Sequence, residues 1–241
     1  MPATVNFKSV FSFLAFVLPF FIAGCVLGEP IEPTAVPSVT PPGDMLSLTT
    51  ANYTYTLVEN QQIPGTKITY RSRDGDNIFI DIDQQAAVRR IGDTLTGTQL
   101  MVPGAHVHYN LRLISAAFSN PYVFGPVTIT IFNPQPLELT NLTEPPPATI
   151  VYEGIGIDFR VPPGRMLPGS SVTFLGVDDL GARLGGTAQY PSLPEQNSFV
   201  WTGRLSNHAI IRYDLTAVSV LPDELQMRGE AKLYLYKNPL N

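Results

Sequence analysis

From residue 45 onward, apolar and polar residues alternate with a period of two over much of the chain. In the clearest stretch Val107, Tyr109, Leu111 and Leu113 are separated by polar residues. Successive side chains of a β-strand point to opposite faces, so the pattern predicts strands with one buried face. Pro, Gly, Asn and Asp interrupt these runs about every 8 to 12 residues. We expect an all-β fold, in which Gln84 to Arg90 is the sole candidate for a helix.

The pattern occurs twice along the chain. Four separated blocks match at a single offset of 104 residues, and in each block the apolar residues fall at the same alternate positions in both copies. The blocks are 53–57 with 157–161, 63–70 with 167–174, 107–115 with 211–219, and 125–131 with 229–235. Matching units of this size, larger than a solenoid repeat, indicate the duplication of a complete domain.

The repeat sets the expected domain organisation. Residues 45–140 and 149–241 are the two units, and a proline-rich linker, 141–148, joins them. About seven strands per unit predict two tandem β-sandwich domains of immunoglobulin-like type. Before them we expect a signal peptide, 1–24, and a disordered tether rich in proline and threonine, 25–44, because its composition offers too little apolar surface for a core.

The N-terminal segment has the order of a secretion signal. Lys8 precedes an apolar run, and small residues follow it. Ile22-Ala23-Gly24-Cys25 resembles the lipobox of bacterial lipoproteins. The resemblance implies that Cys25 receives fatty acyl chains and becomes the first residue of the mature protein. The alternative is an uncleaved transmembrane anchor, since Val10 to Gly28 is nearly long enough to cross a bilayer.

Both alternatives place the bulk of the chain outside the cytoplasm. Val26 follows the cysteine, where the aspartate typical of inner-membrane retention would stand. We therefore expect the lipid anchor in the outer membrane of a two-membrane cell, and otherwise on the outer face of the cytoplasmic membrane.

Charge and cysteine content narrow the function classes. The formal net charge is −5, and the chain without Lys8 has 14 basic and 20 acidic residues, a charge of −6. An acidic chain without a basic cluster is not expected to bind nucleic acid or an anionic membrane surface. Cys25 is the single cysteine, so the exported part must be stabilised by its core and not by disulfides.

The densest acidic cluster is a candidate metal site. Asp74, Asp76, Asp81 and Asp83 are close in sequence, and calcium prefers carboxylate oxygens supplied by loops of this kind. The spacing does not match an EF-hand, and Asp74-Gly75-Asp76-Asn77 is equally typical of a hairpin turn. No other cofactor is expected.

Two further side-chain pairs are candidate sites. Tyr234 and Tyr236 alternate with leucines, so both should lie on the outward face of the last strand, where they could bind a sugar ring, a protein or the neighbouring domain. His106 and His108 share one face of a strand and could supply two metal ligands, although a site needs a third. A solvated face is the favoured interpretation of the histidines.

Catalytic motifs are lacking: the sequence contains no nucleophile elbow, no His-Glu-x-x-His and no phosphate loop. The leading hypothesis is a non-catalytic, membrane-anchored module that binds a glycan or protein partner. The alternatives are a surface hydrolase acting on polysaccharide or peptide, since two carboxylates suffice for glycoside hydrolysis, and a structural subunit of an envelope complex.

Overall fold

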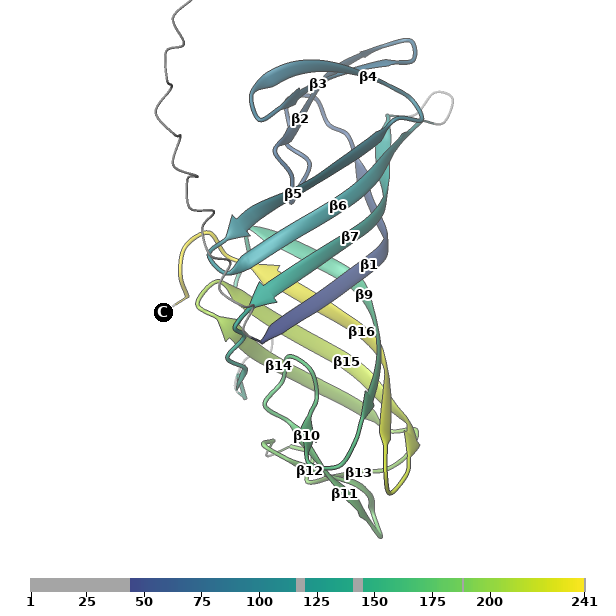
Figure 1. Cartoon of the computed structure of the whole chain (residues 1–241), viewed down its shortest axis with the longest axis vertical. Helices are drawn as coiled ribbons and strands as arrows, with labels where there is room; N and C mark the ends of the chain where they lie inside the picture. The colour runs from purple at the N-terminus through teal and green to yellow at the C-terminus, as the bar shows by residue number, and fades with distance from the viewer. Residues whose placement is uncertain (1–43, 116–119, 141–144, 188, 241) are drawn as a thin grey trace, which may run out of the picture. The chain divides into compact units, whose positions relative to one another are not determined.

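The computed structural model describes residues 44–115, 120–140, 145–187 and 189–240, and every regular element within them is a β-strand (Figure 1). The all-β fold expected from the sequence is thereby confirmed. None of the described elements is a helix that could cross a membrane.

We call residues 44–132 the first half and residues 149–240 the second half. The strands of the first half are β1 (Met45–Thr56), β2 (Ile68–Asp74), β3 (Asn77–Ile82), β4 (Gln85–Arg90), β5 (Thr94–Val102), β6 (Ala105–Ile114) and β7 (Tyr122–Phe132). Those of the second half are β9 (Ile150–Val161), β10 (Arg165–Met166), β11 (Thr173–Asp178), β12 (Gly181–Gly185), β13 (Ser192–Leu193), β14 (Ser198–Ser206), β15 (Ala209–Val220) and β16 (Leu225–Leu235). Between the halves lies the short strand β8 (Leu137–Glu138).

The segment considered for a helix is strand β4, so that expectation was wrong. Asp83 and Gln84 adopt φ values of 51° and 69°, in the left-handed region that a helix cannot contain. They form a two-residue turn after β3, and β4 then pairs with β3 along its whole length. Two consecutive positive φ values are typical of a type I′ hairpin turn.

Each half contains one large and one small antiparallel sheet. The large sheets have the strand orders β1-β7-β6-β5 and β9-β16-β15-β14-β8, and the small sheets are β2-β3-β4 and β10-β11-β12-β13. In an immunoglobulin domain the first, second, fourth and fifth strands share a sheet. The immunoglobulin-like type is therefore not confirmed, whereas the division of each half into two sheets is consistent with a β-sandwich.

The strands recur at the offset seen in the sequence. β5 and β14 begin and end 104 residues apart. The register of the β5–β6 pair shifts between Leu100 and Val102, and that of β14–β15 shifts between Arg204 and Ser206. The two halves thus share irregularities of the backbone as well as strands, and equivalent positions can be compared residue by residue.

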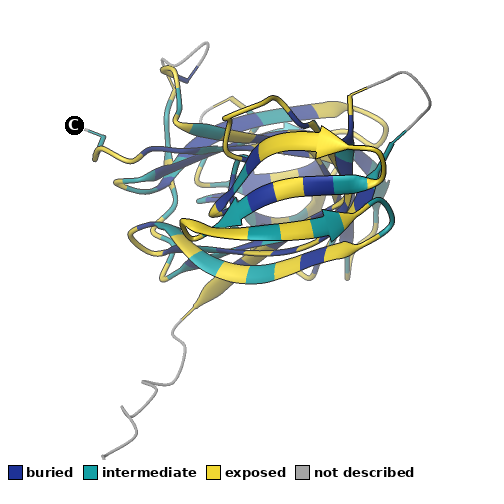
Figure 2. Cartoon of the chain, turned by 90° about the horizontal axis from the view of Figure 1, so that it is seen from above, coloured by how far each residue is buried: buried dark blue, intermediate teal, exposed yellow. Residues whose placement is uncertain are grey.

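The core follows the parity of the strands (Figure 2). In β6, Val107, Tyr109, Leu111 and Leu113 are buried, and in β15 Leu215, equivalent to Leu111, is also buried. The buried side chains of both halves form a single hydrophobic cluster. Strands of this pattern bury one face each, so apposed sheets exclude water from the apolar residues between them.

A tight turn repeated in both halves contributes to that cluster. The buried hydroxyl of Thr66 donates to the Ile63 carbonyl at 2.9 Å and accepts from the Ile68 amide at 3.0 Å. Its equivalent Ser170 makes the same two bonds with Leu167 and Val172, at 3.0 and 3.1 Å. A hydroxyl that satisfies two backbone groups explains why this block is alike in both halves.

The turns also bring the halves together. At Gly65 the first turn lies so close to the Tyr152 hydroxyl of β9 that no side chain would fit. At Gly169 the second turn lies similarly against Leu46 of β1, again without room for a side chain. Each turn therefore packs against the first strand of the opposite half.

The boundary expected at residue 140 placed the segment after β7 in the first half, but the segment pairs with the second half. Leu137 and Glu138 form β8, which pairs antiparallel with β14 of the second half. Farther along, the Tyr236 hydroxyl donates to the Pro146 carbonyl at 3.0 Å. Described parts of the connection are thus attached to the second half by hydrogen bonds.

Candidate functional site

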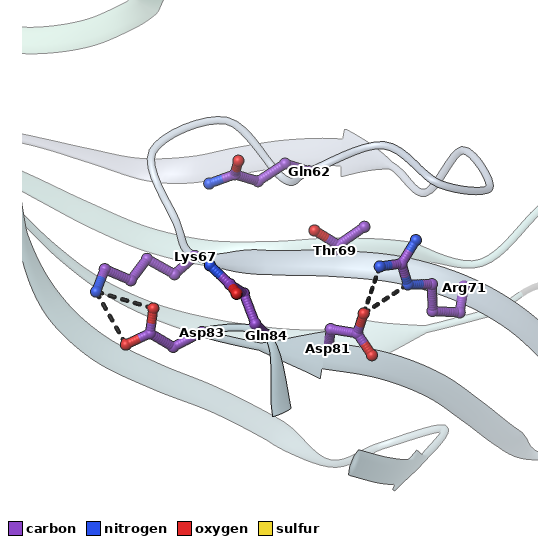
Figure 3. A pocket seen from close by; sticks show the side chains of 7 residues that line it. All are labelled: Gln62, Lys67, Thr69, Arg71, Asp81, Asp83 and Gln84. Atoms are coloured by element: carbon purple, nitrogen blue, oxygen red, sulfur yellow. Dashed lines mark hydrogen bonds and ion pairs between the residues drawn. The ribbon is translucent and has the colours of Figure 1, made fainter. Parts of the chain in front are cut away.

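A polar cavity of about 400 Å³ lies beside the first small sheet (Figure 3). We call it the hairpin groove. It is lined by residues of β2, β3 and the segments that flank them. They are Gln62, Lys67, Thr69, Arg71, Asp81, Asp83 and Gln84.

Strand parity places these side chains on one face. Ile68 and Tyr70 of β2 are buried, so Lys67, Thr69 and Arg71 point to the other side. β3 pairs Asp81 with Thr69 across the hairpin. The left-handed turn at Asp83 and Gln84 then closes this end of the groove.

Two ion pairs cross the groove, as the dashed lines in Figure 3 show. Lys67 Nζ lies 2.9 Å from Asp83 Oδ2, and Arg71 Nε donates to Asp81 Oδ2 at 2.6 Å. Asn60 Oδ1 accepts a further bond from Arg71 at 2.9 Å. Each carboxylate of the groove therefore has a cation beside it.

The groove offers hydrogen-bonding groups but no aromatic surface. Its lining combines an amide pair, a hydroxyl and two ion pairs. Such groups can bind a polar ligand or the polar backbone of a partner. Because both carboxylates are matched by cations at the surface, the groove itself does not form a strongly charged site.

The structure separates the four aspartates proposed for calcium. Asp74 and Asp76 lie at the turn between β2 and β3, where Asp74 pairs with Asn77. Asp81 and Asp83 lie at the opposite end of the same hairpin, roughly 15–20 Å away at about 3.3 Å per residue. Among the described residues no three or more His, Cys, Asp or Glu side chains are grouped as metal ligands would be. The hairpin-turn interpretation of residues 74–77 agrees with the pairing.

The two tyrosines of the last strand differ in exposure. Tyr234 is half-buried, whereas Tyr236 is 6% exposed, so the expected exposed pair does not exist. The cause is that β16 ends at Leu235, and the chain beyond it turns toward the Pro146 carbonyl, to which Tyr236 donates. Burial, with a smaller effect of nearby Tyr234, raises the pKa of Tyr236 to about 12.

The remaining candidates make separate contacts. The His106 ring packs edge-on against Phe132 at 5.1 Å, and His108 Nδ1 is hydrogen-bonded to the Thr98 hydroxyl at 2.9 Å. Among the other carboxylates, those of Glu153 and Asp158 on β9 pair with lysine and arginine of β16. Cys25 lies outside the described residues.

The corresponding face of the second half has different chemistry. Lys67, Arg71 and Asp81 are replaced at the offset of 104 by Ser171, Leu175 and Gly185, and Gln62 is replaced by Met166. Leu175 is 44% and Met166 is 62% exposed. The strand pairing is shared, but one face carries paired charged side chains and the other carries exposed Leu175 and Met166.

Sequence reasoning identified Asp81 and Asp83 but not the other residues of the groove. The available signal was that Lys67, Thr69 and Arg71 alternate with apolar residues, as Asp81 and Asp83 do, which predicts two polar strand faces. This signal is recognisable once the turn at Asp83 is known to fix the register.

No protein-family profile, curated protein or solved structure matches the chain.

Proposed function

We propose that this protein is a lipid-anchored, non-catalytic binding protein of the cell envelope, built from two copies of one β-sandwich module. The anchor would be Cys25, on the strength of the lipobox-like Ile22-Ala23-Gly24-Cys25. The modules would face the extracytoplasmic space, where a binding protein meets its partner.

The observation that carries the proposal is the divergence of equivalent surfaces on a shared backbone. Arg71 and Leu175 are the unpaired residues of the same irregularity, which lies between Tyr70 and Ser72 in one half and between Phe174 and Gly176 in the other. A frame that is retained while its exposed side chains change supports a function in binding, because binding specificity resides in surface chemistry.

Of the two partner classes, a protein is favoured over a glycan. Sugar rings are commonly bound by exposed aromatic side chains, and Tyr236 is buried while the hairpin groove contains no aromatic residue. The exposed Met166 and Leu175 are of the kind found at protein contacts.

The geometry of the groove also supports a non-catalytic role. Glycoside hydrolysis needs one carboxylic acid and one carboxylate that both reach the substrate. Asp81 and Asp83 are each bonded to a cation of the hairpin instead.

Membrane extraction followed by pull-down tests the proposal. The tagged full chain, purified in detergent from its own envelope, should retain one partner protein through washing, and its N-terminal peptide should carry acyl chains by mass spectrometry. Cys25→Ser should remain unacylated and bind the same partner when purified. If mass spectrometry found an unmodified N-terminus at another residue, Cys25 would not be a lipid anchor. If the protein bound on a glycan array and no protein partner were found, its partner would be a glycan. If it hydrolysed an envelope polymer, it would be an enzyme and not a binding protein.

A further inference from the structure

The outer edge of β5 differs from the equivalent edge of the second half. β5 is the last strand of its sheet, and no described residue pairs with its outer side. Its counterpart β14 is covered by β8. Beside that ladder the Leu139 amide donates to the Thr202 carbonyl at 2.9 Å, and the Gln135 amide donates to the Leu205 carbonyl at 2.8 Å.

The repeat identifies the corresponding groups of β5. The offset of 104 relates Thr202 and Leu205 to Thr98 and Met101. In an antiparallel strand the N–H and C=O of one residue point to the same side, and this side alternates along the strand. Thr98 and Leu100 therefore present backbone donors and acceptors outward, as Thr202 and Arg204 do toward β8.

The side chains show the same incomplete covering. The inward positions of β14 at Trp201, Gly203 and Leu205 are all buried, whereas their β5 equivalents, Gly97, Gln99 and Met101, are only half-buried. Leu100, on the outer face, is 60% exposed. The apolar layer is thus closed at the edge of one sheet and open at the edge of the other.

Apart from the irregularity between Leu100 and Val102, β5 has little of the usual protection for a free edge. Proteins commonly place charged residues, prolines or a covering segment on such strands to prevent pairing with other chains. Residues 94–102 contain neither a charge nor a proline. The other edges of the two large sheets are different. There the outer strands β1 and β9 lie against each other, with the rings of Tyr53 and Tyr152 6.0 Å apart.

We propose that β5 binds an extended segment of a partner protein as an added antiparallel strand, in the position that β8 takes on β14. This inference rests on the proposed function and specifies its partner as a polypeptide strand. The segment would carry apolar residues at alternate positions, as this chain does at Leu137 and Leu139. Its amides would donate to the carbonyls of Thr98 and Met101.

A peptide with the sequence of residues 133–140 is the probe, because that sequence occupies the equivalent edge. Added to the full chain in detergent, the fluorescent peptide should bind saturably by anisotropy. Hydrogen exchange should show slower exchange at the amides of Thr98 and Leu100 when the peptide is present. The control peptide carries proline in place of Leu139 and lacks the donor that bonds Thr202 in the structure. It should bind about tenfold more weakly or not at all.

Two substitutions at one position separate backbone from side-chain recognition. Leu100→Pro removes an outward N–H that β6 does not use, which an edge strand tolerates, and should weaken peptide binding about tenfold or more. Leu100→Ala keeps the backbone donor and should change binding less than about threefold. If Leu100→Pro does not fold, the exchange measurement on the unaltered chain decides alone.

Several results would overturn the inference. They are equal loss in both variants, equal binding of both peptides, and no slowing of exchange in β5. Slow exchange of the Thr98 and Leu100 amides before any peptide is added would also overturn it, since the edge would then be covered by the chain itself or by a second copy. If the partner found by pull-down binds Leu100→Pro as well as the unaltered chain, this inference fails and the proposed function stands. If no partner is found, the proposed function fails.

Discussion

Gly125 and Gly229 occupy the same place in the two halves, and each lies against a backbone carbonyl of the neighbouring strand. The carbonyls belong to Asn110 and Asp214, which are themselves equivalent. The φ values of the two glycines are 153° and 156°, where a side chain is rarely accommodated. Both positions therefore need glycine for conformation and for space.

Alanine at either glycine should destabilise the protein. We expect a loss of about 1–3 kcal/mol for Gly125→Ala and for Gly229→Ala, because the new β-carbon would collide with backbone that cannot move cheaply. Urea unfolding of the full chain measures the effect. Gly156→Ala is the control: nothing lies within 4 Å of the added β-carbon, and its φ is not positive. A comparable loss at Gly156 would show that steric contact is not the cause.

The central leucines should be sensitive to truncation. Leu111 and Leu215 are 0% and 1% exposed at equivalent positions of β6 and β15. Replacing either by alanine removes buried methyl groups and leaves a cavity, at a cost of about 2–5 kcal/mol. Their outward neighbours serve as controls: Asn110→Ala and Thr216→Ala should change stability by less than about 0.5 kcal/mol. Thermal melting compares the four variants, and equal effects would contradict the half-buried strand.

Two equivalent tyrosines should respond differently to loss of the hydroxyl. The Tyr213 hydroxyl donates to the Pro168 carbonyl at 2.8 Å, and burial raises its pKa. Within the described chain the Tyr109 hydroxyl makes no hydrogen bond, although the ring is equally part of the core. Tyr213→Phe should therefore cost about 0.5–1.5 kcal/mol, whereas Tyr109→Phe should be near neutral. Denaturant titration of both variants tests the difference. A larger loss for Tyr109→Phe would contradict this hydrogen-bond assignment.

The origin of that difference lies one strand away. Trp201 stacks on Tyr213 with 6.0 Å between ring centres, and its equivalent, Gly97, leaves no room for a side chain beside the Tyr109 hydroxyl. In the first half the Pro64 carbonyl accepts from Tyr53 instead, at 3.4 Å. The same carbonyl position thus receives a tyrosine from a different strand in each half.

These comparisons explain what sequence could and could not predict. Alternation and the offset of 104 suffice for the strands and for buried Leu111 and Leu215, because both signals are local or repeated. β8 is two residues long, too short for a periodic pattern, and its pairing with β14 depends on distant residues. The alternation of residues in the last strand predicts an outward Tyr236, but the strand ends at Leu235, so the alternation no longer applies to it. The hairpin groove was missed because its cations and aspartates become neighbours only through the register of β2 and β3.

Acid should weaken the second small sheet through Asp178. The Leu180 amide donates to this carboxylate at 2.8 Å and the Ser192 hydroxyl donates at 2.9 Å, and these bonds, the amide first, lower the pKa of Asp178 below its ordinary 3.8. Because the folded pKa is the lower one, the stabilisation is fully present above the unfolded pKa and is lost as the pH falls through the folded pKa. The unfolding free energy of the full chain should therefore fall with acid below about pH 4.

This fall should be smaller in Asp178→Asn, which has no charge to lose. Ser192→Ala removes one of the two bonds and should move the carboxyl pKa part of the way back, as NMR titration of Asp178 would measure. An unchanged acid dependence in Asp178→Asn, together with an unchanged Asp178 titration in Ser192→Ala, would show that these hydrogen bonds do not couple the turn to pH.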